Sequence, residues 1–120
     1  MKFFDYINEV GGHSIVPAVK QPKVDFKDIL EVCQHALNGE QKVTKSIYNI
    51  LKVTQEEDDH ATEDFLQFFV LEQREEEVQF NRIIDKIKLI GKGPQSLYYI
   101  DKEFEKLVAV ASKDAKKNKE

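Results

Sequence analysis

Apolar residues recur along two long stretches of the chain in alternating steps of four and three positions. The first repeat comprises Phe26, Leu30, Cys33, Leu37, Glu40, Thr44, Ile47 and Leu51. The second comprises Leu66, Phe69, Gln73, Glu76, Phe80, Ile83, Ile87 and Ile90. This spacing is typical of amphipathic helices, so each repeat predicts a long helix whose repeat positions face a shared core. We call these two sets of positions the seam.

An irregular connection precedes the first long helix. Residues 1–10 are predicted to form the last turns of a helix that ends at a Gly-Gly pair, and residues 11–24 to form an extended connection containing Pro17 and Pro22. At roughly 3.3 Å per residue this connection reaches about 46 Å, which is enough to return along a whole helix bundle. It therefore predicts parallel helices before and after it.

The two long helices are expected at residues 25–55 and 61–90, with Asp25 as the N-cap of the first. The polar turn between them makes an antiparallel hairpin. A short helix is expected at residues 95–107, and residues 108–120 form a lysine-rich tail that is expected to be disordered. Because the sequence shows no strand pattern, the predicted fold class is all-α.

Three polar residues, Glu40, Gln73 and Glu76, interrupt the apolar seam. Counted from a turn centre near residue 58, Glu40 lies about 18 positions before the turn and Glu76 about 18 after it, so a helical rise of 1.5 Å per residue places them level. Carboxylates at one level of a helical core are costly unless they are paired, protonated or bound to a cation. Oxygen ligands suit iron, manganese, magnesium or calcium, so the pattern leaves the metal open.

The acidic run at residues 72–77 adds Glu72 and Glu75 to this level. Both lie within one helical turn of Glu76, and together the three form a ladder of oxygens partly turned inward. The alternative is that the run is an ordinary solvated helix face. Pattern alone does not decide between a metal site and a solvated face.

Composition narrows the classes of function. The 120 residues are 41% apolar and 33% charged, with a net charge of −4. This charge gives no electrostatic case for nucleic acid, and no apolar run approaches the roughly 20 residues that cross a membrane. There is no signal-peptide core, and Cys33 is the one cysteine, so we expect a cytoplasmic protein whose thiol is buried on the seam.

Five segments taken together resemble a known family. They are residues 4–6 (Phe-Asp-Tyr), 39–41 (Gly-Glu-Gln), 65–77, 84–87 and 97–103. The chain resembles the bacterial non-haem ferritins, which are ferritin-like di-iron four-helix bundles with helices lettered A to D and a short helix E. The resemblance implies a ferritin-like domain at 1–107, in which 1–10 match the end of helix B, 11–24 the B–C crossover, 25–55 helix C, 61–90 helix D and 95–107 helix E.

The resemblance also implies a function in iron storage and detoxification. Subunits of this family assemble into a cage of two dozen copies, oxidise Fe(II) with O₂ or peroxide, and store the ferric mineral inside. Glu40 and Glu76 match carboxylates of the ferroxidase centre and Gln73 matches the polar residue over it, so these three are the implied catalytic residues. Glu72 and Glu75, with Glu76, match the ligands of an additional iron site. The implied iron ligands are therefore Glu40, Glu72, Glu75 and Glu76.

The chain has no match for the family's helix A or for most of its helix B. Those helices supply a Glu and a Glu-x-x-His motif to the ferroxidase centre, so we expect the chain alone to be inactive as a ferroxidase. We expect a fragment, produced by an internal gene start, an incomplete sequence or a deliberate truncation. Two alternatives stay open: a non-enzymatic metal-binding helical bundle, and a helix-hairpin module that self-associates into a four-helix bundle.

Overall fold

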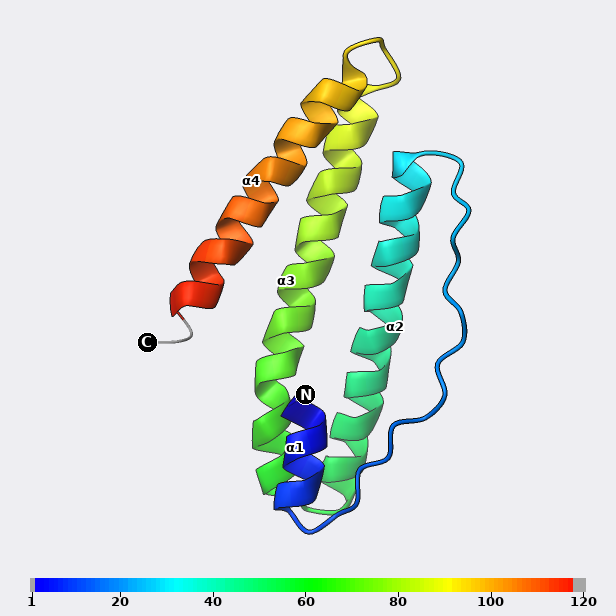
Figure 1. The fold of residues 1–120 in the computed structure, drawn as a ribbon. Helices are drawn as coiled ribbons and strands as arrows, with labels where there is room; N and C mark the ends of the chain where they lie inside the picture. Colours follow the sequence, from blue (N-terminus) through cyan, green and yellow to red (C-terminus); the bar gives the residue numbers. More distant parts are fainter. Residues whose placement is uncertain (1, 118–120) are drawn as a thin grey trace.

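The computed structural model describes the backbone of residues 2–117 and the side chains of residues 2–110. Within that range it contains four helices and no strand: α1 (Lys2–Glu9), α2 (Ile29–Glu56), α3 (His60–Ile90) and α4 (Ser96–Lys117). Figure 1 shows α2 and α3 side by side as an antiparallel hairpin, with α4 returning along α3. The predicted all-α fold class is confirmed. No helix in the described part of the chain is long and apolar enough to cross a membrane.

The seam packs α2 against α3. Its most enclosed side chains are Leu66, 1% exposed, and Cys33, 2% exposed, so the predicted burial of the cysteine is confirmed. Burial also raises the pKa of the Cys33 thiol. Ile47 and Ile87 are buried in the same layer. Since burying an aliphatic side chain contributes roughly 1.5–3 kcal/mol, this layer is the main source of stability of the hairpin.

The helix α2 begins later than predicted, because Asp28 and not Asp25 is its N-cap. The Asp28 carboxylate accepts a hydrogen bond from the Glu31 N–H at 2.9 Å. Glu31 in turn accepts from Lys23 Nζ at 2.6 Å and from the Lys27 N–H at 2.5 Å, which ties the crossover to the first turn. A Glu three positions after the cap is the spacing of a capping box, and this signal distinguishes Asp28 from Asp25.

The turn between the long helices is compact. α2 ends at Glu56 and α3 begins at His60, with Asp58 in the left-handed region at φ 53°. Asp59 caps α3, because its two carboxylate oxygens accept from the Thr62 N–H at 3.1 Å and the Thr62 hydroxyl at 2.6 Å. These hydrogen bonds lower the pKa of Asp59. The short turn fixes the register between the two helices.

Aromatic side chains attach α1 to the beginning of α3. The Tyr6 ring stacks on Phe65 with centroids 4.0 Å apart, and the Phe3 ring lies 4.3 Å from that of Phe69. Gly11, at φ 85°, terminates the helix in a conformation that favours glycine. The crossover then runs the length of α2, so α1 and α2 are parallel (Figure 1), as the length of the connection predicts.

The helix α4 extends to Lys117, beyond the predicted end at residue 107. Residues 108–117, which the sequence analysis expected to be disordered, are helical, whereas residues 118–120 lie outside the described residues. Alanine and lysine are strong helix formers, and a helix that is already nucleated extends at little cost. The prediction was wrong here because it considered only which side chains could pack.

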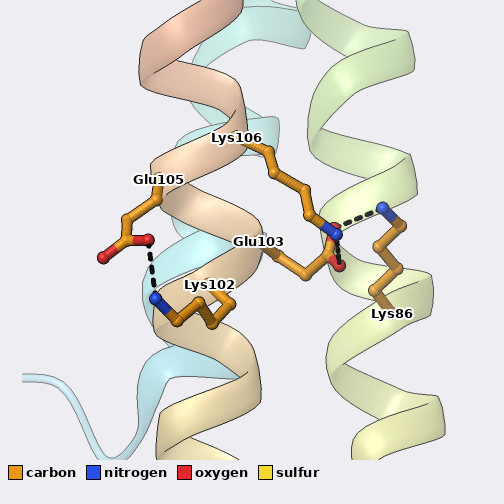
Figure 2. A network of polar contacts seen from close by, with 5 residues as sticks. All are labelled: Lys86, Lys102, Glu103, Glu105 and Lys106. Atoms are coloured by element: carbon orange, nitrogen blue, oxygen red, sulfur yellow. Dashed lines mark hydrogen bonds and ion pairs between the residues drawn. The ribbon is translucent and has the colours of Figure 1, made fainter.

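Both apolar and charged contacts hold α4 against α3. Ile100 is 6% exposed and joins the core cluster with Ile83 and Ile87. Figure 2 shows Glu103 between two lysines, pairing with Lys86 of α3 and with Lys106 of its own helix. Because exposed ion pairs contribute little, the apolar contact carries most of the attachment.

Replacing the cap residue tests the start of α2. Asp28→Ala removes the acceptor for the Glu31 N–H, so it should lower the free energy of unfolding by about 1 kcal/mol. Asp25→Ala is the matched control and should leave that free energy unchanged within error. Urea denaturation followed by circular dichroism measures both. Equal losses from the two variants would contradict the assignment of Asp28 as the cap.

A pair of substitutions separates the two contacts of α4. Ile100→Ala should lower the free energy of unfolding by about 2 kcal/mol or more, since it leaves a cavity beside Ile83 and Ile87. Glu103→Gln removes only the exposed ion pairs and should have a much smaller effect. Amide hydrogen exchange of α4 should rise in the first variant. A larger loss of unfolding free energy from Glu103→Gln than from Ile100→Ala would contradict the claim that the apolar contact carries most of the attachment.

Candidate metal centre

The polar positions of the seam meet midway along the α2–α3 hairpin. Gln73 of α3 reaches across to Glu40 of α2: its side-chain amide donates to Glu40 Oε2 at 3.0 Å and lies 3.1 Å from the Glu40 carbonyl oxygen. The same amide nitrogen is 3.3 Å from the hydroxyl of Thr44. Glu40 and Gln73, two of the three polar residues that interrupt the seam, are therefore in direct contact.

Glu77 joins this cluster although the sequence analysis did not select it. The Thr44 hydroxyl lies 3.0 Å from Glu77 Oε1 and 3.0 Å from the Glu40 carbonyl oxygen, and it can donate to either. Glu77 comes one position after the seam residue Glu76, so the apolar periodicity did not predict it as part of the cluster. Thr44 gave no decisive signal, because a threonine hydroxyl in a helix can donate to the carbonyl four residues earlier, as it can here to Glu40.

Glu76 was predicted at a seam position that faces the core, and this prediction was wrong: Glu76 is exposed, whereas Glu77, the next residue of α3, is half-buried and contacts Thr44. Burial of the Glu76 carboxyl raises its pKa, although the residue as a whole is exposed, and the negative charges of Glu40, Glu72 and Glu75 raise the pKa further. Three of the carboxyls predicted as metal ligands therefore act electrostatically on the fourth, Glu76. Glu76 holds a proton more tightly than an isolated glutamate does.

Glu72 and Glu75 lie toward different surfaces. Glu72 lines a cavity of about 630 Å³ between α1, the crossover and α3. Glu75 lines a cavity of about 390 Å³ on another side of α3, together with Arg74 and Arg82. Among the side chains that the structure describes, no three His, Cys, Asp or Glu residues are grouped so that they could hold a metal ion. The metal-ligand roles of Glu40, Glu72, Glu75 and Glu76 stay predictions.

The cluster offers oxygen donors, which suit hard cations such as iron. The Gln73 amide engages one carboxylate oxygen of Glu40, and a carboxylate has a second oxygen with which to bind a cation. A cation placed among these carboxyls would lower the pKa of Glu76, because an opposite charge favours the ionised form. The arrangement is chemically suited to binding a divalent cation.

The raised pKa of Glu76 predicts a dependence of stability on pH. The folded chain holds the Glu76 proton above the usual pKa of 4.5, so stability falls as the pH rises from that value through the raised folded value. Glu76→Gln should therefore increase the free energy of unfolding at pH 7, by less than about 1 kcal/mol because the residue is exposed. The gain should vanish below about pH 4.

Urea denaturation from pH 3 to pH 8 measures this effect, with Glu57→Gln in the turn as the control variant. A gain that is the same at every pH would show that the substitution acts through packing or helix propensity and not through the charge of Glu76.

Comparisons with known proteins identify the family. A family model described as the ferritin-like domain matches residues 1–90. Bacterial non-heme ferritins of Staphylococcus aureus (strain MRSA252) and Staphylococcus epidermidis are 40% and 41% identical over 102 residues, which is 85% of this chain and 61% of each relative. The chain thus spans about three fifths of the length of these relatives.

A solved structure gives the same result. The open pore ferritin of the archaeon Archaeoglobus fulgidus superimposes with a TM-score of 0.81 at 37% identity, over 85% of this chain and 63% of that one. The helical hairpin, the long crossover and the family match agree. This chain belongs to the family of ferritin-like domains.

Proposed function

We propose that the chain serves in iron storage and detoxification, as a ferritin subunit that takes up Fe(II) as its substrate. Membership of the ferritin-like domain family supports this proposal, as do relatives named bacterial non-heme ferritins. The observation that carries it is the contact between Glu40 and Gln73 beside Glu76, midway along the hairpin. Several carboxyls gather at this level of the hairpin, and a bound cation would offset their repulsion.

In the proposed reaction, Glu40 and Glu76 bind Fe(II) and Gln73 orients the Glu40 carboxylate through its amide. Glu72 and Glu75 bind further iron together with Glu76. Binding would offset the repulsion that Glu40, Glu72 and Glu75 exert on Glu76, since a cation favours the ionised form of a carboxyl. In an assembly that supplies the helix A and helix B ligands missing from this chain, electrons would pass from Fe(II) to O₂ or peroxide, and the ferric product would be stored as mineral.

Assembly into a cage of two dozen copies in the cytoplasm is part of the same proposal. One stripe of α2 carries exposed apolar side chains: Val32, Val43, Ile50 and Val53. Exposed apolar side chains on one side of a helix can be covered by association with another helix. The stripe supports association with further helices, and the carboxyls of the cluster would then lie in a more enclosed site.

Removing the central carboxyls tests the proposal. In anaerobic calorimetry with the full chain, Glu40→Ala combined with Glu76→Ala should weaken Fe(II) binding at least about tenfold, since both proposed ligands are lost. Asp101→Ala combined with Glu105→Ala, on α4, is the control of equal charge change and should bind Fe(II) like the parent chain. Equal binding by the two double variants would contradict the proposed site.

Admitting O₂ after Fe(II) has bound distinguishes the remaining possibilities. Growth of ferric absorbance at a rate set by the protein would support oxidation at the site. Fe(II) binding without such oxidation would leave a metal-binding bundle in place of a ferroxidase.

A further inference from the structure

A separate pocket lies at the end of the hairpin that is opposite the α2–α3 turn. There α2 begins, α3 ends and α4 begins, near the top of Figure 1. Its volume is about 520 Å³, which is within the range of small-molecule binding sites. Leu30 lies in the wall of the pocket, and Glu40 of the carboxyl cluster lies about 15 Å further along α2. The pocket is therefore distinct from the carboxyl cluster.

The wall of the pocket is largely apolar. Leu30 of α2, Ile87 of α3 and Ile100 of α4 contribute to it, and the latter two are 7% and 6% exposed. Leu97, also part of the lining, is 73% exposed. A ligand with an alkyl chain could pack against the buried isoleucines and cover Leu97. This burial would remove apolar surface of the ligand and of the pocket from water, which favours binding.

Three lysines from two different segments line the same pocket: Lys27, Lys88 and Lys92. Within residues 2–110 no ion pair involves the ammonium group of any of the three. The acid of the lining is Asp28, whose carboxylate already accepts the Glu31 N–H, and Glu31 itself pairs with Lys23. The lining therefore carries a net positive charge beside an apolar wall.

Lys88 alone has another explanation, because a lysine in the last turn of a helix is favoured by the helix dipole. That explanation does not apply to Lys27, which precedes α2, or to Lys92, which follows the Gly91 cap. A purely apolar ligand would leave the three ammonium groups unused, and a small inorganic anion would leave the apolar wall unused. One ligand class uses both features.

We propose that this pocket binds a single-chain amphiphilic anion, with its alkyl chain against Leu30, Ile87 and Ile100 and its carboxylate or phosphate headgroup at Lys88 and Lys92. Such a headgroup would form charge-assisted hydrogen bonds with the ammonium groups. The proposal is independent of iron binding, because none of these residues belongs to the carboxyl cluster.

Calorimetry with decanoate and the full chain tests the proposal. One decanoate should bind per chain, and decyl phosphate should bind in its place. Lys88→Gln combined with Lys92→Gln should weaken binding at least about tenfold, because two charge-assisted contacts are lost. Lys45→Gln combined with Lys52→Gln, on exposed positions of α2, is the control for net charge and should bind as the parent chain does.

The ligand controls separate headgroup, tail and source. Inorganic phosphate, decanol and decyltrimethylammonium should each bind at least about tenfold more weakly than decanoate, since each lacks one of the two recognised features. Binding to phosphatidylglycerol vesicles without binding of free decanoate would overturn the proposal in favour of a membrane surface. Equal binding of decanoate and decyltrimethylammonium would also overturn it.

Amide chemical shifts locate the ligand. On addition of decanoate, the largest changes should fall at Leu30, Ser96 and Leu97. Changes concentrated instead around Phe3 and Phe68, which line the cavity beside α1, would assign the ligand to that cavity and contradict the proposal.

Discussion

The packing of the apolar seam between α2 and α3 is the interaction on which the rest of the structure depends. Buried residues lie on both sides of the polar level, with Ile47 and Leu66 toward the turn and Cys33 and Ile83 toward the other end. Since the two helices cannot slide without exposing these side chains, the height of Glu40 relative to α3 is fixed. The buried apolar residues, which have no chemical role, therefore set the geometry of the polar residues between them.

The polar level is arranged so that its hydrogen bonds connect the helices while its charges repel. Gln73 contributes to this balance, because its neutral amide donates to Glu40 where a glutamate would add a further negative charge. Thr44 links the same level to Glu77. Glu76, by contrast, experiences the charges of its neighbours as a raised pKa. A cation at this level would offset the repulsion and favour the ionised form of Glu76.

Periodicity predicted the two long helices and the seam because it reports directly which side of a helix is buried. It could not choose between Asp25 and Asp28 as the cap, since that choice depends on how Glu31 ties the crossover to the first turn. It also assigned Glu76 in place of Glu77 to the buried side of α3, because steps of four and three average 3.5 residues and drift from the 3.6 residues of a helical turn. Packing arguments predicted the end of the last helix at residue 107, but α4 continues to Lys117 because the residues that follow have high helix propensity.

The central claim is that the carboxyls midway along the hairpin bind iron. Anomalous diffraction at the iron absorption edge, from crystals of the chain grown with Fe(II), tests this claim most directly. The account predicts an anomalous peak within bonding distance of carboxylate oxygens of Glu40 and Glu76. Peaks confined to other acids of the chain, with none at this pair, would contradict it.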